Sequence, residues 1–203
     1  MNKILTIAAA MLMGTAAFAQ DNIKSIEIGS SIPMGDVKMK GVDKKELALN
    51  DVKTNDGLLV MFSCNTCPYV VKSQERTKEM LAYAKAKGIG AVVINSNEAK
   101  RESDDSPKAM AKYAKENGYS NVGYLIDEKS KLADAFGATR TPEVFLFDGN
   151  GKLMYKGAME DNPAAPVESK ELYLKDAIDK ITSGQVPDPA STKSIGCTIK
   201  RVS

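Results

Sequence analysis

The chain has 203 residues, with 28 Lys and Arg against 26 Asp and Glu, and it contains no histidine. The absence of histidine excludes Ser-His and Cys-His catalysis and the zinc sites that use an imidazole ligand. The nearly balanced charge favours neither a nucleic-acid partner nor an anionic membrane surface. The length suffices for one domain with a hydrophobic core.

Residues 1–19 are predicted to be a removable export signal. Lys3 gives a positive start, residues 4–17 are largely apolar, and Ala17-Phe18-Ala19 offers small residues for cleavage after Ala19. The apolar run is too short to cross a bilayer comfortably, and no later stretch is long and apolar enough. We therefore expect a periplasmic or secreted protein with no stable membrane insertion after signal removal. Its domain is expected over residues 20–184, followed by a tail at 185–203.

The patterns along the domain alternate between strands and helices. Strands are expected near 36–41, 46–50, 58–62, 89–96 and 122–126. Helices are expected over 68–85, 127–136 and 169–184, and from Ser106-Pro107 to near Asn117-Gly118. Strands 143–147 and 152–157 flank the turn sequence Asp-Gly-Asn-Gly, which predicts a hairpin. This order predicts one three-layer α/β domain with a mixed central sheet.

Cys64 and Cys67 lie where the 58–62 strand is expected to end and a helix to begin. Free amides and the positive end of the helix dipole stabilise a thiolate at such a place. The thiolate is the form that attacks disulfides or peroxides. We expect an exposed Cys64 to attack and a more buried Cys67 to release the mixed disulfide.

Two other interpretations of this cysteine pair are an inert disulfide and a metal site. A disulfide across so short a loop stabilises a fold little, because the entropic gain shrinks with loop length. A zinc ribbon needs a second cysteine pair, and only Cys197 remains. A copper(I) site with two or three thiolates is open, but nothing in the sequence supports it. We therefore expect no metal and no bound cofactor.

Three segments carry a resemblance to a known superfamily. They are LLVMFSCNTCPYV (58–70), GATRTPEVFLFDGNGKLMYKGAMEDN (137–162) and SIGCTIK (194–200). Together they resemble the thioredoxin-like superfamily, and more closely its peroxiredoxin-like branch of alkyl hydroperoxide reductases and thiol-specific antioxidant proteins, over roughly residues 26–200. The resemblance implies a thioredoxin fold with Pro142 in the cis form. It also implies that the Thr141 backbone lies beside the cysteines and pairs with an extended substrate strand.

The chain departs from the peroxidase pattern in two positions. In peroxiredoxins the peroxidatic cysteine follows a threonine, and a later arginine helps to hold the peroxide. Here Cys64 replaces the threonine and Pro142 takes the place of the arginine. The pattern therefore favours an exported thiol–disulfide oxidoreductase, with a disulfide-containing protein as substrate and an upstream thiol protein as reductant. Two alternatives stay open: a thiol peroxidase that uses Cys67, with Cys64 or Cys197 resolving, and a non-enzymatic binding domain.

The third cysteine, Cys197, allows three interpretations. It is a buried or free thiol in a loose tail, a partner in an intermolecular disulfide, or a third redox cysteine. In the last case the tail folds back, and Cys197 resolves a bond at Cys64 or shields it. Among the nearby charged residues, Lys72 is a candidate for lowering a thiol pKa, and Glu75 and Glu143 are candidate proton acceptors for Cys67.

Overall fold

Five strands form the central sheet in the order β5-β4-β3-β7-β8. Their bounds are β3 (Leu58–Ser63), β4 (Gly90–Asn95), β5 (Gly123–Ile126), β7 (Glu143–Phe147) and β8 (Leu153–Gly157). β3 is parallel to β4, and β4 to β5, whereas β7 is antiparallel to both β3 and β8. The predicted mixed sheet is therefore confirmed. The structure, a computed structural model, describes residues 23–202, so the predicted export signal lies outside the described residues.

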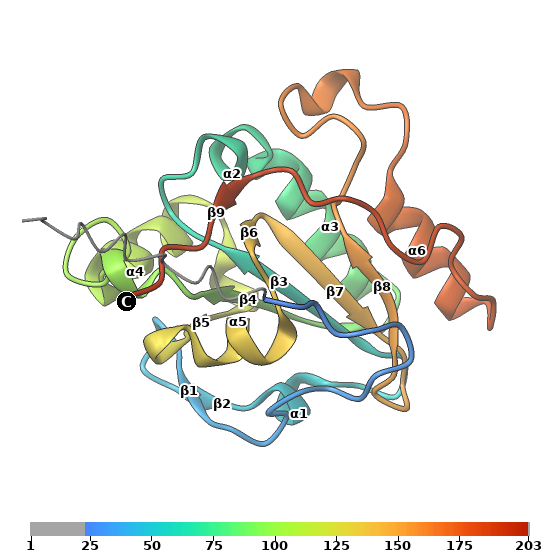
Figure 1. Cartoon of the computed structure of the whole chain (residues 1–203), viewed down its shortest axis with the longest axis horizontal. Helices are drawn as coiled ribbons and strands as arrows, with labels where there is room; N and C mark the ends of the chain where they lie inside the picture. The colour runs from blue at the N-terminus through green and yellow to red at the C-terminus, as the bar shows by residue number, and fades with distance from the viewer. Residues whose placement is uncertain (1–22, 203) are drawn as a thin grey trace, which may run out of the picture.

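Strand β3 is buried on both faces because its side chains alternate between two hydrophobic clusters. Leu59 and Met61 belong to one cluster, and Leu58, Val60 and Phe62 to the other. The first cluster is covered by α3 (Gln74–Ala86), α4 (Pro107–Glu116) and α6 (Tyr173–Thr182), and the second by α1 (Leu49–Val52), α5 (Lys131–Phe136), β1 (Met39–Lys40) and β2 (Glu46–Leu47). Figure 1 shows these layers on either side of the sheet, which confirms the three-layer arrangement.

The helix predicted over residues 68–85 is divided into α2 (Pro68–Lys72) and α3. The break falls at Ser73, which is buried and whose hydroxyl donates to the carbonyl of Pro163, 3.4 Å away. The Ser73 backbone, at φ −86° and ψ 13°, leaves helical geometry, although its amide still donates to Tyr69 and its carbonyl still accepts from Thr77. α2 is therefore a separate short helix that begins directly after the cysteine pair.

Four other elements differ from the sequence prediction. Residues 46–50 form only the short strand β2 and then enter α1, because the Asp51 carboxylate accepts the Ala48 amide at 2.7 Å and caps that helix. The closing helix α6 begins four residues later than predicted, since the Lys170 and Glu171 amides bond to Asp161 instead. Strands β6 (Arg140–Thr141) and β9 (Cys197–Thr198) were not predicted, because two residues carry no periodic signal.

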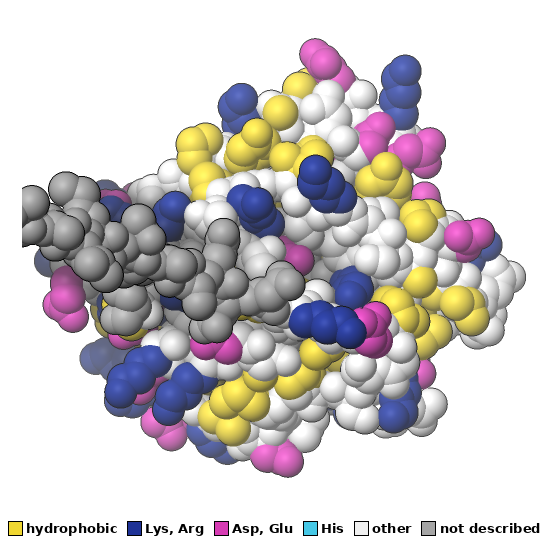
Figure 2. All heavy atoms as spheres, viewed as in Figure 1, with side chains coloured by type: hydrophobic (Ala, Val, Ile, Leu, Met, Phe, Trp, Pro, Cys, Tyr) yellow, Lys and Arg dark blue, Asp and Glu magenta, His cyan; other side chains and the backbone are white. Residues whose placement is uncertain are grey.

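The C-terminal tail packs back onto the domain. It leaves α6, runs along β8, passes α2 and β6, and ends beside α5, where Arg201 pairs with Asp134 (Figure 1). Ala190 and Thr192 exchange backbone hydrogen bonds with Lys156 of β8, and the Ala99 amide donates to Lys200. Within residues 23–202 no helix combines the length and apolar character that crossing a bilayer requires. On the face that Figure 2 shows, acidic and basic side chains of the described residues are interspersed.

Candidate active site

The cysteine pair lies at the junction of β3 and α2. Cys64 follows the last residue of β3, and Cys67 is the residue before the first turn of α2, with Pro68 at the first helical position. Proline suits this position because its fixed φ matches the helix and no amide is lost. Cys64 is 2% exposed and Cys67 4%. The expectation of an exposed Cys64 is therefore wrong: Tyr113 and the tail pack against the pair.

The Thr141–Pro142 peptide bond is cis, and Thr141 contacts both cysteines. The Cys67 sulfur lies 3.2 Å from the Thr141 carbonyl oxygen, and the Cys64 sulfur lies 3.4 Å from the Thr141 hydroxyl. The structure thus brings together the four residues that the sequence singled out, from segments 74 to 77 positions apart. The backbone of Thr141 stands beside the cysteines, as the resemblance implied.

Cys197 joins this group from the tail. Strand β9 pairs antiparallel with β6, so that Cys197 lies opposite Thr141 and Thr198 opposite Arg140. Cys197 is partly buried and packs against Cys64, Cys67 and Val70. No disulfide joins the three cysteines in this arrangement. The interpretation of a loose tail is therefore wrong for the described residues.

Hydrogen bonding among the sulfurs separates their pKa values. The Cys64 thiol, the Cys197 thiol and the backbone amides of Val70 and Cys197 lower the pKa of Cys67 to about 4, against the opposing effect of burial. The same bond to Cys67, together with burial, raises the pKa of Cys64, although the Thr141 hydroxyl and the Cys67 amide act in the opposite direction. Burial and the neighbouring Cys67 raise the pKa of Cys197 to about 11.

A buried polar network behind the cysteine loop was missed by sequence reasoning. Asp105 is fully buried, and its carboxylate accepts the backbone amide of Asn65 at 2.9 Å. It also accepts the side-chain amides of Asn95 at 2.7 Å and Asn97 at 2.9 Å. The Tyr124 hydroxyl donates to the Asn65 side chain at 2.9 Å. The segment around Asp105 is polar and irregular, so nothing in its pattern marked one of several acidic residues as buried.

The other charged candidates lie elsewhere. Glu143 is buried, but its carboxylate accepts the amides of Thr139 and Arg140 at 2.8 and 3.0 Å, so it orders the loop before Pro142. Glu75 is at the surface and pairs with Lys78, and Lys72 is exposed. Among residues 23–202 no group of three or more Cys, Asp or Glu side chains is arranged to hold a metal ion.

Comparisons with known proteins show the family of this chain. Residues 27–173 match the protein family described as Redoxin. The thiol:disulfide interchange protein DsbE of Escherichia coli K12 is 30% identical, over 84% of this chain and 89% of that protein.

Solved structures extend the comparison to the fold. A hypothetical protein from Sinorhizobium meliloti superposes with a TM-score of 0.79 at 30% identity, over 89% of this chain and 97% of that one. An uncharacterised conserved protein from Geobacillus kaustophilus superposes with a TM-score of 0.77 at 34% identity, over 87% of this chain and 93% of that one. The peroxidoxin BcpB of Mycobacterium tuberculosis, at 14% identity and a TM-score of 0.54 over 78% and 95%, shares the fold.

Proposed function

Since the chain belongs to the Redoxin family, in the peroxiredoxin-like branch of the thioredoxin-like superfamily, we propose that it is an exported thiol–disulfide oxidoreductase that exchanges protein disulfides through Cys64 and Cys67. The observation that carries this proposal is the contact of both sulfurs with Thr141, whose backbone already pairs with an extended segment. The relative named as a thiol:disulfide interchange protein supports the reaction class. Export is proposed from the leader pattern of residues 1–19.

In the first step a substrate strand replaces the tail at Thr141. Departure of Cys197 removes a thiol and an amide that stabilise the Cys67 thiolate. The proton that Cys64 shares with Cys67 then moves to Cys67, whose thiol donates to the Thr141 carbonyl. The Cys64 thiolate, held by the Thr141 hydroxyl and the Cys67 amide, attacks one sulfur of the substrate disulfide. A mixed disulfide forms, and the other substrate sulfur leaves as a thiolate.

In the second step the leaving thiolate takes the proton of Cys67. The Cys67 thiolate attacks the Cys64 sulfur, the mixed disulfide breaks, and the remaining substrate sulfur departs. The substrate has gained two electrons, and the chain holds a Cys64–Cys67 disulfide. An upstream thiol protein restores the dithiol by the same exchange in reverse. Pro142 and Thr141 orient the substrate, and no bound cofactor takes part.

The proposal is tested by following the reduction of insulin disulfides by the reduced chain. We expect the rate to fall to that of the free reductant in Cys64→Ser. The Cys67→Ser variant should accumulate a mixed disulfide with the substrate at Cys64, because the resolving sulfur is missing. If the Cys64→Ser variant instead accumulated a mixed disulfide at Cys67, then Cys67 would be the attacking cysteine and Cys64 the resolving one. Wild-type protein without insulin reduction would overturn the proposal and leave the thiol peroxidase and the non-enzymatic binding domain.

One observation favours a thiol peroxidase as second candidate. The low pKa of Cys67 keeps its thiolate populated at neutral pH, and this is the sulfur that the alternative uses. Burial of Cys67 and the presence of Pro142 in the place of the peroxide-binding arginine oppose it. Rapid consumption of hydrogen peroxide with a sulfenic acid at Cys67 would favour the peroxidase.

A further inference from the structure

The chain supplies its own occupant for the position at which a substrate strand is proposed to pair. Residues Gly196–Thr198, named here the docked segment, lie antiparallel to β6 with Cys197 opposite Thr141. A strand from another protein needs the same backbone groups of Thr141. Binding of such a substrate and docking of the tail therefore exclude each other.

The fit of the docked segment depends on a glycine. A Cβ atom at Gly196 would lie 2.2 Å from the Thr141 carbonyl oxygen and 2.7 Å from its carbonyl carbon. No side chain can be accommodated at such distances without moving the backbone. The absence of a side chain at Gly196 lets the tail approach the Thr141–Pro142 loop closely enough for the next residue, Cys197, to reach the cysteine pair.

Cys197 packs against the cluster that Cys64, Cys67 and Val70 form. Its partner residue in the strand pair, Thr141, has its carbonyl oxygen 3.2 Å from the Cys67 sulfur. Cys197 also lowers the pKa of Cys67, and Cys67 raises that of Cys197. The sequence left both Cys64 and Cys67 open as partners of Cys197, and the position opposite Thr141 favours Cys67.

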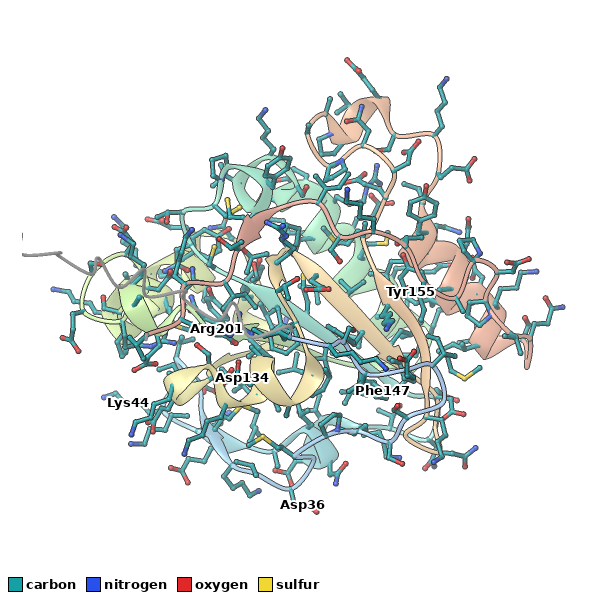
Figure 3. The ribbon with its side chains drawn as sticks, in the orientation of Figure 1. Asp36, Lys44, Asp134, Phe147, Tyr155 and Arg201 are labelled. Atoms are coloured by element: carbon teal, nitrogen blue, oxygen red, sulfur yellow. The ribbon has the colours of Figure 1, made fainter. Side chains whose placement is uncertain are left out.

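The tail is anchored on both sides of the docked segment. On one side the Thr192 hydroxyl lies 2.6 Å from the Tyr155 hydroxyl and accepts the Ala158 amide at 3.0 Å. On the other side Ile199 is buried in the core and Arg201 pairs with Asp134 at 2.7 Å. Tyr155, Asp134 and Arg201 are labelled in Figure 3.

The segment between the two anchors is poorly supported. Residues 193–195 line a cavity of about 660 Å³, and the buried Ser194 hydroxyl has no hydrogen-bond partner among the described residues. Between its anchors the tail therefore has a cavity beside it and a buried hydroxyl without a partner, so a smaller loss of contacts opposes its displacement here than at the anchors.

We propose that the docked segment acts as an internal substrate strand and that Cys197 exchanges with Cys67, so that the site has a second disulfide state, Cys67–Cys197. The inference rests on the proposed function of the Cys64–Cys67 pair. The Cys197 thiolate attacks Cys67 in the Cys64–Cys67 disulfide; the Cys67–Cys197 bond forms, the Cys64–Cys67 bond breaks, and Cys64 leaves as a thiolate that takes up the proton lost by Cys197. No electrons are gained or lost. While the second disulfide persists, no other strand can pair with Thr141.

The Cys64→Ser variant isolates the second disulfide. In glutathione buffers, one oxidised glutathione and the two thiols give the Cys67–Cys197 disulfide and two reduced glutathiones. The equilibrium constant measures the effective concentration of Cys197 at Cys67. A freely moving tether gives millimolar values, and we expect a value at least about 100-fold higher because the tail is docked. Peptide mapping should show the Cys67–Cys197 link in a monomer. A millimolar value, separate glutathione adducts on the two cysteines, or a disulfide-linked dimer would each overturn the proposal.

A second variant tests the register. Gly196→Ala, combined with Cys64→Ser, should lower the effective concentration about tenfold or more, because the methyl group cannot fit against Thr141. Lys193→Ala, an exposed tail residue that contacts no cysteine, should leave it unchanged. An unchanged effective concentration in the Gly196→Ala variant would contradict the pairing of the docked segment with Thr141. Insulin reduction by the wild-type chain reports separately on the proposed function, since the glutathione equilibrium requires no activity.

Discussion

The cysteine loop, residues 64–67, and the tail both reach Thr141, but they are held in place differently. The loop is held from inside the protein, where Asn65 bonds through its amide to Asp105, through its side-chain nitrogen to the Asp104 carbonyl, and through its side-chain oxygen to Tyr124. The tail is held at its anchors but lies over a cavity at residues 193–195. A rigid pair of sulfurs thus faces a replaceable strand, and the difference indicates which partner moves during exchange.

The largest predicted difference between the cysteine loop and the tail is in the pKa values of their cysteines. Cys67 has a pKa of about 4, whereas Cys197 stays a thiol up to about 11. Because the pKa of Cys67 is lowered from 9.0, its thiolate forms as pH rises through about 4 and is lost as pH falls through it. Ultraviolet thiolate absorbance of the reduced protein should show one titration near pH 4. In Cys197→Ala this midpoint should rise, since one donor to the thiolate is removed. A single midpoint near 9 in the wild type would contradict the arrangement.

Removing the support of the cysteine loop should cost the most stability. Asp105→Ala leaves the Asn65 amide and the side-chain amides of Asn95 and Asn97 buried without their acceptor. We expect the free energy of unfolding to fall by about 3 kcal/mol or more, because each unsatisfied buried group costs roughly 1–3 kcal/mol. Urea denaturation measures this change. Asp104→Ala, at an exposed neighbour, should change it by no more than about 0.5 kcal/mol. Equal effects of the two variants would show that the network does not hold the loop.

Removing the core anchor of the tail should cost less. Ile199→Ala truncates a buried side chain at the edge of the core, and we expect a loss of about 2 kcal/mol, near the lower end for such truncations. Cys197 should also react faster with an alkylating reagent, because undocking exposes it. Val202→Ala, at an exposed position, serves as control. Unchanged reactivity of Cys197 in Ile199→Ala would mean that the docked segment is held by other contacts.

The smallest effect is expected at the ionic anchor. Arg201 and Asp134 form a partly exposed pair, and Arg201 also donates to the Ala138 carbonyl at 2.7 Å. Such pairs contribute up to about 1 kcal/mol and are screened by salt. Arg201→Gln should therefore raise the alkylation rate of Cys197 slightly at low salt and hardly at all at high salt. An effect larger than that of Ile199→Ala would invert the order of the two anchors.

Several features of the fold followed from local patterns because each carried a strong signal. The continuous apolar run at 58–62 predicted the central strand, and the Asp-Gly-Asn-Gly turn predicted the hairpin of β7 and β8. The break at Ser73 was not predicted, because a single residue outside helical geometry leaves no mark in the apolar pattern. Cys64 was expected to be exposed because the residues that cover the cysteine pair come from distant segments, α4 and the tail.

By itself, the sequence determined the strand–helix order and the placement of Cys64 and Cys67 at a helix start, and its resemblance to a known family implied the position of Thr141 beside them. These properties depend on residues that are close together in the sequence or on a short motif that can be recognised in the sequence alone. Only the tertiary structure decided that Asp105 supports the cysteine loop, that Cys197 packs against the cysteine pair, and that the tail takes the strand position beside Thr141. Each of these depends on contacts between residues 40 or more positions apart, and neither periodicity nor spacing specifies which distant segments meet.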